Sequence, residues 1–387
     1  MSTTPYLSLV ACSRNDDHGG NLLNRMQLFV RGFLEQCRRH QLRAELILVE
    51  WNPPAERPRL KDALSWPVEG GACDVRIIEV PPEIHRRFKN SDRLPLFQMI
   101  AKNVGIRRAR GEFILATNID ILFSDDIMQF FTSGKMKPRR LYRVDRYDVP
   151  ANVPEGLDIR EQLEFCRNNV IRVHARRRTQ DLLYIGNRMF ANNKPSRRFR
   201  NWRTWPLTNE VRGLIYEGRE RVRYRWPLFR SEAKVMLEGI QNFLFPNSLP
   251  SFGFQLPMNL HTNACGDFTL LSAADWANLR GYSELEMFSM HLDSLLCHAA
   301  HHSGVRERVL RDPMRIYHLD HGVGSGWSPE GEEKLFKRID TAGIDRLSTE
   351  QMYDWAIEMR RNGKPKIFND ESWGLVKEDL PETVIAA

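Results

Sequence analysis

The sequence predicts an α/β domain with a mainly parallel sheet and helices on both faces. Buried-strand patterns alternate with helical patterns, the strands at 6–12, 44–51, 75–80 and 112–118 and the helices at 22–40 and 96–111. Strands that alternate with helices form parallel sheets, because the chain must cross back before the next strand begins. A length of 387 residues allows one large domain or two small ones.

Local patterns support each predicted element. In the first helix, apolar residues recur at helical spacing, and the second helix ends at a glycine. Further along, Ser272 is placed to cap a helix that runs through Trp276, and another helix covers about 289–303. The segment 309–327 then predicts a strand and a glycine-rich loop.

The chain divides into four predicted parts. A nucleotide-binding part covers 1–139, a basic insertion 140–250, a second core part 251–328 and a helical tail 329–387. Within the insertion, residues 171–230 hold 16 Arg or Lys against four Asp or Glu, interleaved with Trp and Tyr. The strand and helix pattern is lost in this segment, which is why we separate it from the core.

Composition excludes several classes of protein. No run of about 18 apolar residues predicts a membrane span, and the first 16 residues lack a signal-peptide pattern. The six cysteines form no CxxC pair, so we expect reduced thiols and no zinc knuckle. These features predict a cytoplasmic protein. The net charge of +8 favours anionic partners such as phosphorylated substrates, nucleic acid or an anionic membrane.

Polar residues follow the strand at 112–118, where parallel sheets bind ligands. Asn118 and Asp120 are suited to a divalent cation that bridges to phosphate oxygens, since Mg²⁺ and Mn²⁺ prefer oxygen ligands. The alternative is that Asp120 only caps a turn. For Asp125 and Asp126 we favour a structural role, as acids in the first turn of a helix.

The segment KNVGIRRARGEFILATNID resembles glycosyltransferases of the GT-A fold, in which a helix reading like RNxGxxxARGE leads into a strand that ends in a DxD motif. YLSLVACSRND and ELILVEWN are similar to the first two nucleotide-binding strands of that family. GDFTLLSAADWANLRGYSE resembles its acceptor-side segment, and HLD stands where an acidic ED motif usually lies. The resemblance covers about 1–130 and 260–327.

The resemblance implies a Rossmann-like GT-A domain and a set of binding residues. Glu50 stands where an acid usually reads the uracil or ribose, and Asp267 is a candidate for a sugar hydroxyl. Asn118 replaces the first acid of DxD, so metal binding would rest on Asp120. The other residues expected near the nucleotide sugar are Ala11, Ser13, Arg14, Asn103 and Asn118 itself.

Two further roles remain open between candidates. The catalytic base is expected to be Asp293, with His291 next and Glu284 or Glu286 as alternatives. The second metal ligand is expected to be His318 rather than His321, and the glycine-rich loop 322–327 is a candidate to close over the diphosphate.

The resulting prediction is a metal-assisted transferase using Mn²⁺ or Mg²⁺. It moves a sugar from a nucleotide-diphosphate donor to a glycan or lipid-linked acceptor, in cell-surface polysaccharide or lipopolysaccharide synthesis, and we favour inversion over retention. The basic segment would contact anionic lipid or a phosphorylated glycan. The alternative is a nucleic-acid-binding protein that uses segment 171–230, although no RNP-type, KH or zinc signature supports it.

Overall fold

The computed structural model describes residues 4–66, 73–176, 178–185, 188–191, 258–321 and 329–385. The chain forms two compact units, one of Met1–Thr179 with Asn259–Ala387 and the other of Gln180–Met258. In the second unit the described residues belong mainly to an antiparallel pair, β9 (Arg178–Ile185) and β10 (Arg188–Ala191). Most of the basic segment 171–230 and the glycine-rich loop 322–327 therefore lie outside the described residues.

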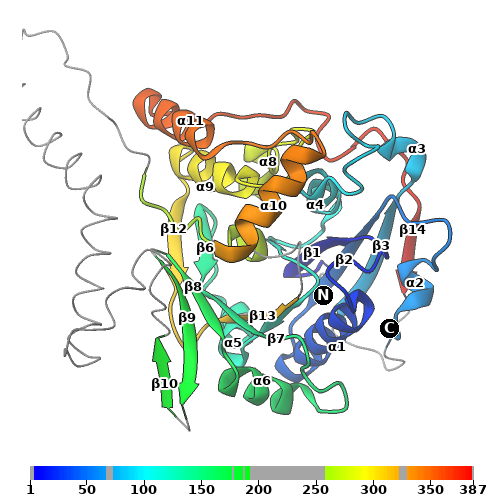
Figure 1. The fold of residues 1–387 in the computed structure, drawn as a ribbon, viewed down its shortest axis with the longest axis vertical. Coiled ribbons are helices and arrows are strands. Elements are labelled where there is room, and N and C mark those ends of the chain that lie inside the picture. Colours follow the sequence, from blue (N-terminus) through cyan, green and yellow to red (C-terminus); the bar gives the residue numbers. More distant parts are fainter. Residues whose placement is uncertain are drawn as a thin grey trace, which may run out of the picture. The chain divides into compact units, whose positions relative to one another are not determined.

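The first unit is built on an eight-stranded sheet (Figure 1). Strands β3, β2, β1, β4, β6 and β12 run in one direction, and β11 and β14 run against their neighbours. This confirms the predicted α/β class with a mainly parallel sheet. In spatial order the strands are β12 (Arg306–Leu310), β6 (Arg140–Val144), β11 (Thr269–Ser272), β4 (Phe113–Ala116), β1 (Leu7–Ser13), β2 (Ala44–Trp51), β3 (Cys73–Val80) and β14 (Glu382–Ile385).

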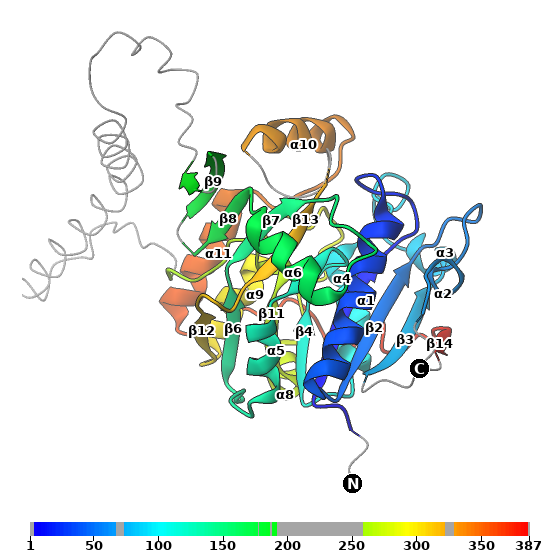
Figure 2. The same ribbon diagram turned by 90° about the horizontal axis from the view of Figure 1, so that it is seen from below.

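Helices cover both faces of this sheet, and α1 and α4 lie on opposite sides of it (Figures 1 and 2). Among the described residues the helices are α1 (Leu22–His40), α2 (Leu60–Ala63), α3 (Pro82–His85), α4 (Gln98–Arg108), α5 (Asp125–Thr132), α6 (Ile159–Asn168), α8 (Ala273–Leu279), α9 (Leu292–His302), α10 (Pro329–Thr341) and α11 (Thr349–Asn362). None of them is long and apolar enough to cross a bilayer.

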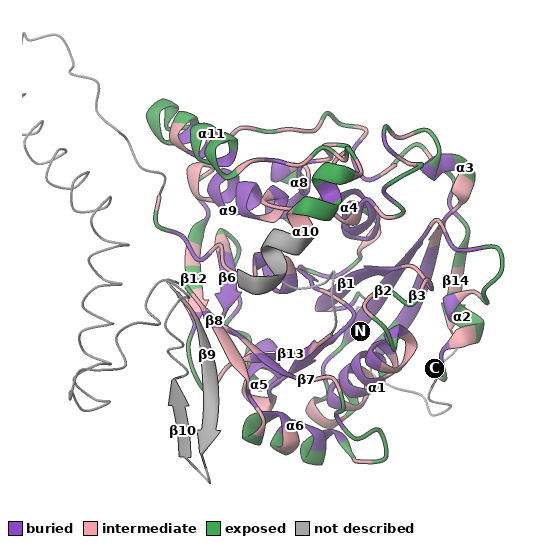
Figure 3. Cartoon of the chain, in the orientation of Figure 1, coloured by how far each residue is buried: buried purple, intermediate pink, exposed green. Residues whose placement is uncertain are grey.

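The central strands are buried along their whole length (Figure 3). Because side chains alternate across a strand, Leu9 of β1 joins the core cluster that includes Phe29 of α1, while Val10 faces α4. There, a methyl group on Gly105 would lie 2.5 Å from the Val10 side chain, so only glycine permits this approach of α4 to the sheet.

A second group of strands lies beside the main sheet and supplies part of the candidate site. Within the first unit its order is β8, β7, β13 and β5, with β13 parallel to β7 and antiparallel to β5. The strands are β5 (Ile121–Phe123), β7 (Arg146–Pro150), β8 (Arg172–Ala175) and β13 (Ile316–Asp320).

Some predicted boundaries need correction. The expected insertion 140–250 begins too early, because β6 pairs with β11 and β12 inside the main sheet and residues up to Thr179 belong to the first unit. The expected helical tail 329–387 also contains β14, which pairs with β3 at the sheet edge. Strands β6 and β14 are short, and the strands with which they pair lie far away in sequence. Local sequence patterns therefore do not predict where they belong.

Smaller predictions are confirmed. Asp125 and Asp126 do lie in the first turn of α5, where Ser124 accepts a hydrogen bond from the Ile127 N–H. Ser272 caps α8 by accepting from the Asp275 N–H. Both caps satisfy backbone donors that the first helical turn leaves unpaired.

Candidate active site

Strand pairing brings the predicted metal residues together. Asp120 lies in the turn between β4 and β5, and its carbonyl accepts a hydrogen bond from the Leu319 N–H of β13 at 3.0 Å. His318 lies on β13, opposite Asp148 of β7. Residues distant in sequence thus meet beyond the end of β4.

Asp120, His318 and His321 form a cluster whose ligand atoms all lie within 4.8 Å of one another. The Nε2 atom of His321 lies 2.9 Å from Asp120 Oδ2, and the Nε2 atom of His318 lies 3.8 Å from the same oxygen. We expected one of the two histidines to join Asp120, and the structure places both there.

Asp148 is a member of the site that the sequence reading missed. Its Oδ1 lies 3.1 Å from His318 Nδ1, and it is buried with an exposure of 1%. A carboxylate that holds the Nδ1–H of a histidine directs the Nε2 lone pair to the opposite side, which here is the side of Asp120. In RYDVP, Tyr147 and Val149 alternate with Arg146 and Asp148, which could have indicated a strand, but the segment lies within the predicted insertion 140–250.

Nearby charges set the protonation of the cluster. Burial alone would raise the pKa of Asp120, but His318, His321 and Arg25 lower it overall, so the carboxylate is ionised at neutral pH. Burial lowers the pKa of His321 despite the opposing effect of Asp120. Burial and Arg146 lower the pKa of His318, but Asp120 and Asp148 raise it overall. A metal binds the carboxylate and the neutral imidazoles, so its binding would release a proton from His318.

The residues present fit a divalent cation. Asp120 Oδ1 is buried and has no hydrogen-bond partner among the described residues, so it offers an open acceptor. One carboxylate and two imidazoles form a mixed oxygen and nitrogen donor set. Such a set suits a first-row divalent ion better than Mg²⁺, which prefers oxygen ligands.

A buried ionic network extends from the cluster. Arg146 lies 2.9 Å from Asp148 Oδ1 through Nε and 2.6 Å from Asp267 Oδ2 through Nη1. Asp267 in turn accepts a hydrogen bond from the Asn118 amide. Burial lowers the pKa of Arg146, but Asp148 and Asp267 raise it overall, so the guanidinium stays charged.

Lys102 completes this network from the other side. Its ammonium donates to Asn118 Oδ1 at 2.8 Å and to the Gly266 carbonyl at 2.7 Å. Asn118 therefore accepts from a cation and donates to the carboxylate of Asp267. An aspartate at this position could not donate, which gives a physical reason for the departure from DxD.

We expect Asn118→Asp to destabilise the fold even though it restores the DxD pattern. The new carboxylate would face Asp267 without a proton between them, and we expect a loss of about 1–3 kcal/mol in the free energy of unfolding by urea. In Asn118→Asp with Asp267→Asn, donor and acceptor exchange places, so at least about 1 kcal/mol should return. Additive losses in the double variant would contradict this account of Asn118.

The candidate bases differ in their surroundings. Asp293 lies in the first turn of α9, and its Oδ2 would meet a methyl group on Gly266 at 3.1 Å, so it borders the loop that carries Asp267. His291 Nε2 lies 3.1 Å from Thr349 Oγ1 of α11. Asp293 is therefore the candidate next to the network.

The two glutamate alternatives are engaged elsewhere. Glu284 accepts from the Asn103 amide and the Gly374 N–H, and burial raises its pKa. Glu286 accepts from the Lys89 N–H at the surface. Both carboxylates therefore have structural partners.

The expected nucleotide residues lie along the ends of β1 and β2. Ala11 and Ser13 are buried in β1, and Arg14 follows, donating from Nε to the Asn52 carbonyl at 2.7 Å. Glu50 is 1% exposed and accepts from the Leu60 N–H at 3.0 Å.

Burial raises the pKa of Glu50 to about 7, so its proton is partly retained at neutral pH. A group with a raised pKa stabilises the fold at low pH and loses that contribution as pH rises between the unfolded and folded pKa values. We expect Glu50→Gln to gain about 2 kcal/mol relative to the natural chain between pH 4.5 and pH 8, after allowing for screening by solvent. Urea unfolding at both pH values measures this. Exposed Glu112→Gln is the control, and an equal gain there would contradict the assignment.

Asn103 has a different place from the one expected. It is fully buried, and its amide donates to the Tyr282 carbonyl and accepts from the Tyr282 N–H, both at 2.8 Å. It braces the GYSE segment against α4. The proposed nucleotide site below therefore omits it.

No protein-family model matches the chain, and no curated protein matches it in sequence. The chain is similar to two solved structures of TarS from S. aureus. One, of residues 1–349 in complex with UDP, has 11% identity and a TM-score of 0.33, over 89% of this chain and 68% of that one. The other has 11% identity and a TM-score of 0.34, over 92% of this chain but only 43% of that one. Similarity at this level carries no argument about activity, so the function depends on the residues of the site.

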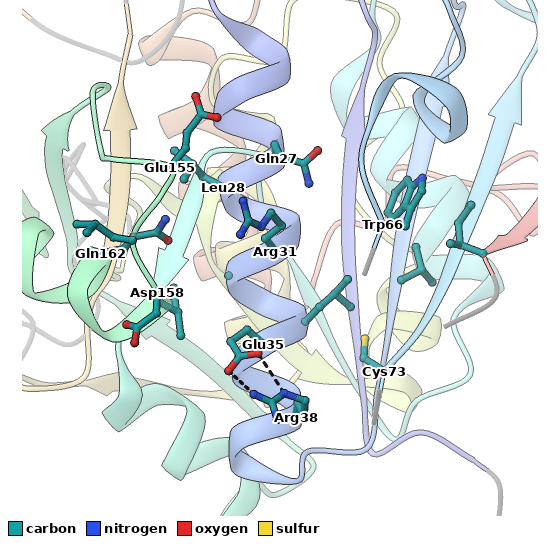
Figure 4. A pocket seen from close by; sticks show the side chains of 16 residues that line it. Gln27, Leu28, Arg31, Glu35, Arg38, Trp66, Cys73, Glu155, Asp158 and Gln162 are labelled. Carbon is teal, nitrogen blue, oxygen red and sulfur yellow. Dashed lines mark hydrogen bonds and ion pairs between the residues drawn. The ribbon is translucent and has the colours of Figure 1, made fainter. Parts of the chain in front are cut away.

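A groove of about 670 Å³ lies elsewhere, along the flanks of α1. Figure 4 shows Arg31 and Gln27 of this helix between Trp66 on one side and Gln162 on the other. Neither the Asp120 cluster nor the Asp267 network lines it, so we do not assign it to the reaction.

Proposed function

We propose that this protein is a glycosyltransferase of the GT-A type, which transfers a sugar from a nucleotide-diphosphate donor with the assistance of a divalent metal. The cluster of Asp120, His318 and His321 carries the proposal. It lies at the edge of a mainly parallel sheet where such folds bind ligands. One of its three ligand groups, Asp120, has a carboxylate oxygen without a hydrogen-bond partner among the described residues. The sequence resemblance to GT-A enzymes supports it as an analogy of fold.

Asp120, His318 and His321 would hold the metal ion, and Asp148 would orient His318. When bound, such an ion neutralises charge that develops on the departing diphosphate. Because two of the three ligands are imidazole nitrogens, we favour Mn²⁺ over Mg²⁺.

The ends of β1 and β2 would bind the nucleotide. In this proposal Ala11 and Ser13 line the site, Arg14 adds positive charge, and Glu50 hydrogen-bonds the base or ribose. Asn118 and Asp267 would contact or position the donor sugar. A carboxyl group with a pKa near 7 both donates and accepts hydrogen bonds at neutral pH. Such a group suits a base or ribose that presents both hydrogen-bond donors and acceptors.

Asp293 would take the proton from the acceptor hydroxyl as that oxygen attacks the anomeric carbon. A base on the acceptor side corresponds to an inverting transfer, which we favour over retention. Asp293 borders the loop of Asp267, so donor and acceptor would meet between the two carboxylates.

The acceptor would be a glycan or lipid-linked glycan of the cell surface, met by a cytoplasmic enzyme at the inner face of the membrane. The support is the basic, aromatic-rich segment 171–230, with 16 basic residues against four acidic ones. Lys and Arg are attracted to anionic lipid, and aromatic rings favour the headgroup boundary.

We expect co-sedimentation with vesicles that contain anionic lipid, and we expect it to weaken as salt is added, because screening shortens the range of the attraction. Neutral vesicles of the same size are the control. Equal binding to both kinds of vesicle, or binding to neither, would contradict a peripheral membrane role.

A thermal-unfolding screen tests the proposed function directly. Mn²⁺ with UDP or GDP should raise the melting temperature more than either component alone, since a ligand that binds only the folded state stabilises it. EDTA should remove the metal-dependent part. Stabilisation by oligonucleotides and not by nucleotides would instead favour a nucleic-acid-binding protein.

A further inference from the structure

Arg25 of α1 forms an ion pair with Asp120, a residue of the candidate metal site. Its Nη1 lies 3.0 Å from Asp120 Oδ2, and the side chains are 1% and 8% exposed. Both histidines of the cluster approach this same oxygen. A cation held by the three ligands would therefore share the Asp120 carboxylate with a guanidinium that is already bound to it.

Arg25 also holds the loop that follows β1. Its Nη2 donates to the His18 carbonyl at 2.6 Å and to the Gly20 carbonyl at 3.2 Å. Gly19 lies between them and packs so closely on His321 that a side chain would collide with the ring. The guanidinium thus connects this loop to Asp120.

In the pair of Arg25 and Asp120, each side chain has one buried polar atom without a hydrogen-bond partner among the described residues. Asp120 Oδ1 lacks a donor, and Arg25 Nε lacks an acceptor, among the residues that the structure describes. An unpaired buried N–H is costly, and an anionic oxygen would satisfy it. Arg binds phosphate oxygens through several N–H groups at once.

We propose that Arg25 is a positioning residue that occupies Asp120 in the absence of donor and moves to the donor's diphosphate when the metal binds. This inference rests on the proposed function. Two cations repel at such short range, so metal and guanidinium compete for the Asp120 carboxylate. A nucleoside diphosphate relieves the competition because it offers Arg25 another anion. Metal and nucleotide should then bind cooperatively, each raising the affinity for the other by the same factor.

The test measures Mn²⁺ affinity, by titration calorimetry or by electron paramagnetic resonance of free Mn²⁺, with and without UDP. In Arg25→Met we expect the dissociation constant for Mn²⁺ without UDP to fall about tenfold. The gain in affinity on adding UDP should be smaller than in the natural chain. Arg31→Met, which removes an exposed arginine of the same helix, should change neither value.

Each other outcome is decisive. Unchanged or weaker Mn²⁺ binding in Arg25→Met would overturn the competition, and an unchanged effect of UDP would overturn the transfer to phosphate. If Arg25→Met does not fold, Arg25→Gln keeps a hydrogen-bond donor for the loop carbonyls but removes the charge, and its Mn²⁺ affinity should also rise. Binding of Mn²⁺ with UDP in the natural chain, without any change in the variants, would reject this inference alone. No Mn²⁺ binding under any condition would reject the metal-assisted function as well.

Discussion

Asp120→Ala should abolish transfer, with a loss in kcat/KM of about 10³-fold or more, and it should remove the dependence of nucleotide binding on Mn²⁺. The size follows from the several kcal/mol that a metal contributes when it stabilises developing charge. The variant deletes the carboxylate that both histidines approach and leaves them without a shared ligand atom.

The folded state of this variant needs its own control, because removing one partner of a buried ion pair leaves Arg25 uncompensated. Asp120→Asn keeps the shape and serves as the second variant. Asp126→Ala deletes a neighbouring carboxylate of α5 that lies outside the cluster, and it should retain activity. Full activity of Asp120→Ala, or of the natural chain in EDTA, would contradict a role for the metal.

Asp293→Asn should lower kcat by about 10²-fold or more while nucleotide affinity stays nearly unchanged. The substitution keeps the shape of the side chain and removes its basicity, and general-base catalysis contributes an effect of this size. Asp293 lies beside Gly266, so the loss should appear in the chemical step and not in donor binding.

His291→Ala and Glu286→Gln are the matched comparisons, since both residues were alternatives for the base. Loss of activity only in His291→Ala would identify the histidine as the base. If none of the three matters, the transfer is expected to retain configuration, and NMR of the anomeric proton of the product would show the donor's configuration preserved.

Local patterns were sufficient for the elements on which the site is built. The spacing of apolar residues in 22–40 predicted α1, and the buried run FILAT followed by polar residues predicted a strand that ends at Asn118 and Asp120. These predictions succeed because helix and strand periods and capping residues act over a few positions. Asn103 and Gly105 of KNVG stood out in the sequence because of the family resemblance. In the structure Gly105 allows α4 to pack on β1, and Asn103 holds Tyr282 through hydrogen bonds.

The partners of those residues depended on pairing between distant segments. Asp148 joins the site because β13 pairs with β7, and it lies 170 positions from His318 in the sequence. The same applies to Arg25, which reaches Asp120 across 95 positions. No periodicity encodes which strand lies beside which, and we therefore assigned β6 and β7 to an insertion.

The sequence by itself determined that this protein is an α/β domain whose buried strand delivers Asn118 and Asp120 to the edge of the sheet, where parallel sheets commonly bind ligands. Only the tertiary structure decided that two histidines share Asp120 with Arg25, and that Asn118 must be an amide because it lies between Lys102 and Asp267. The physical reason is the distance along the chain over which the deciding interactions act. Strand and helix formation depends on neighbours along the chain, whereas the charge and hydrogen-bonding state of a buried group depends on whatever the fold packs against it.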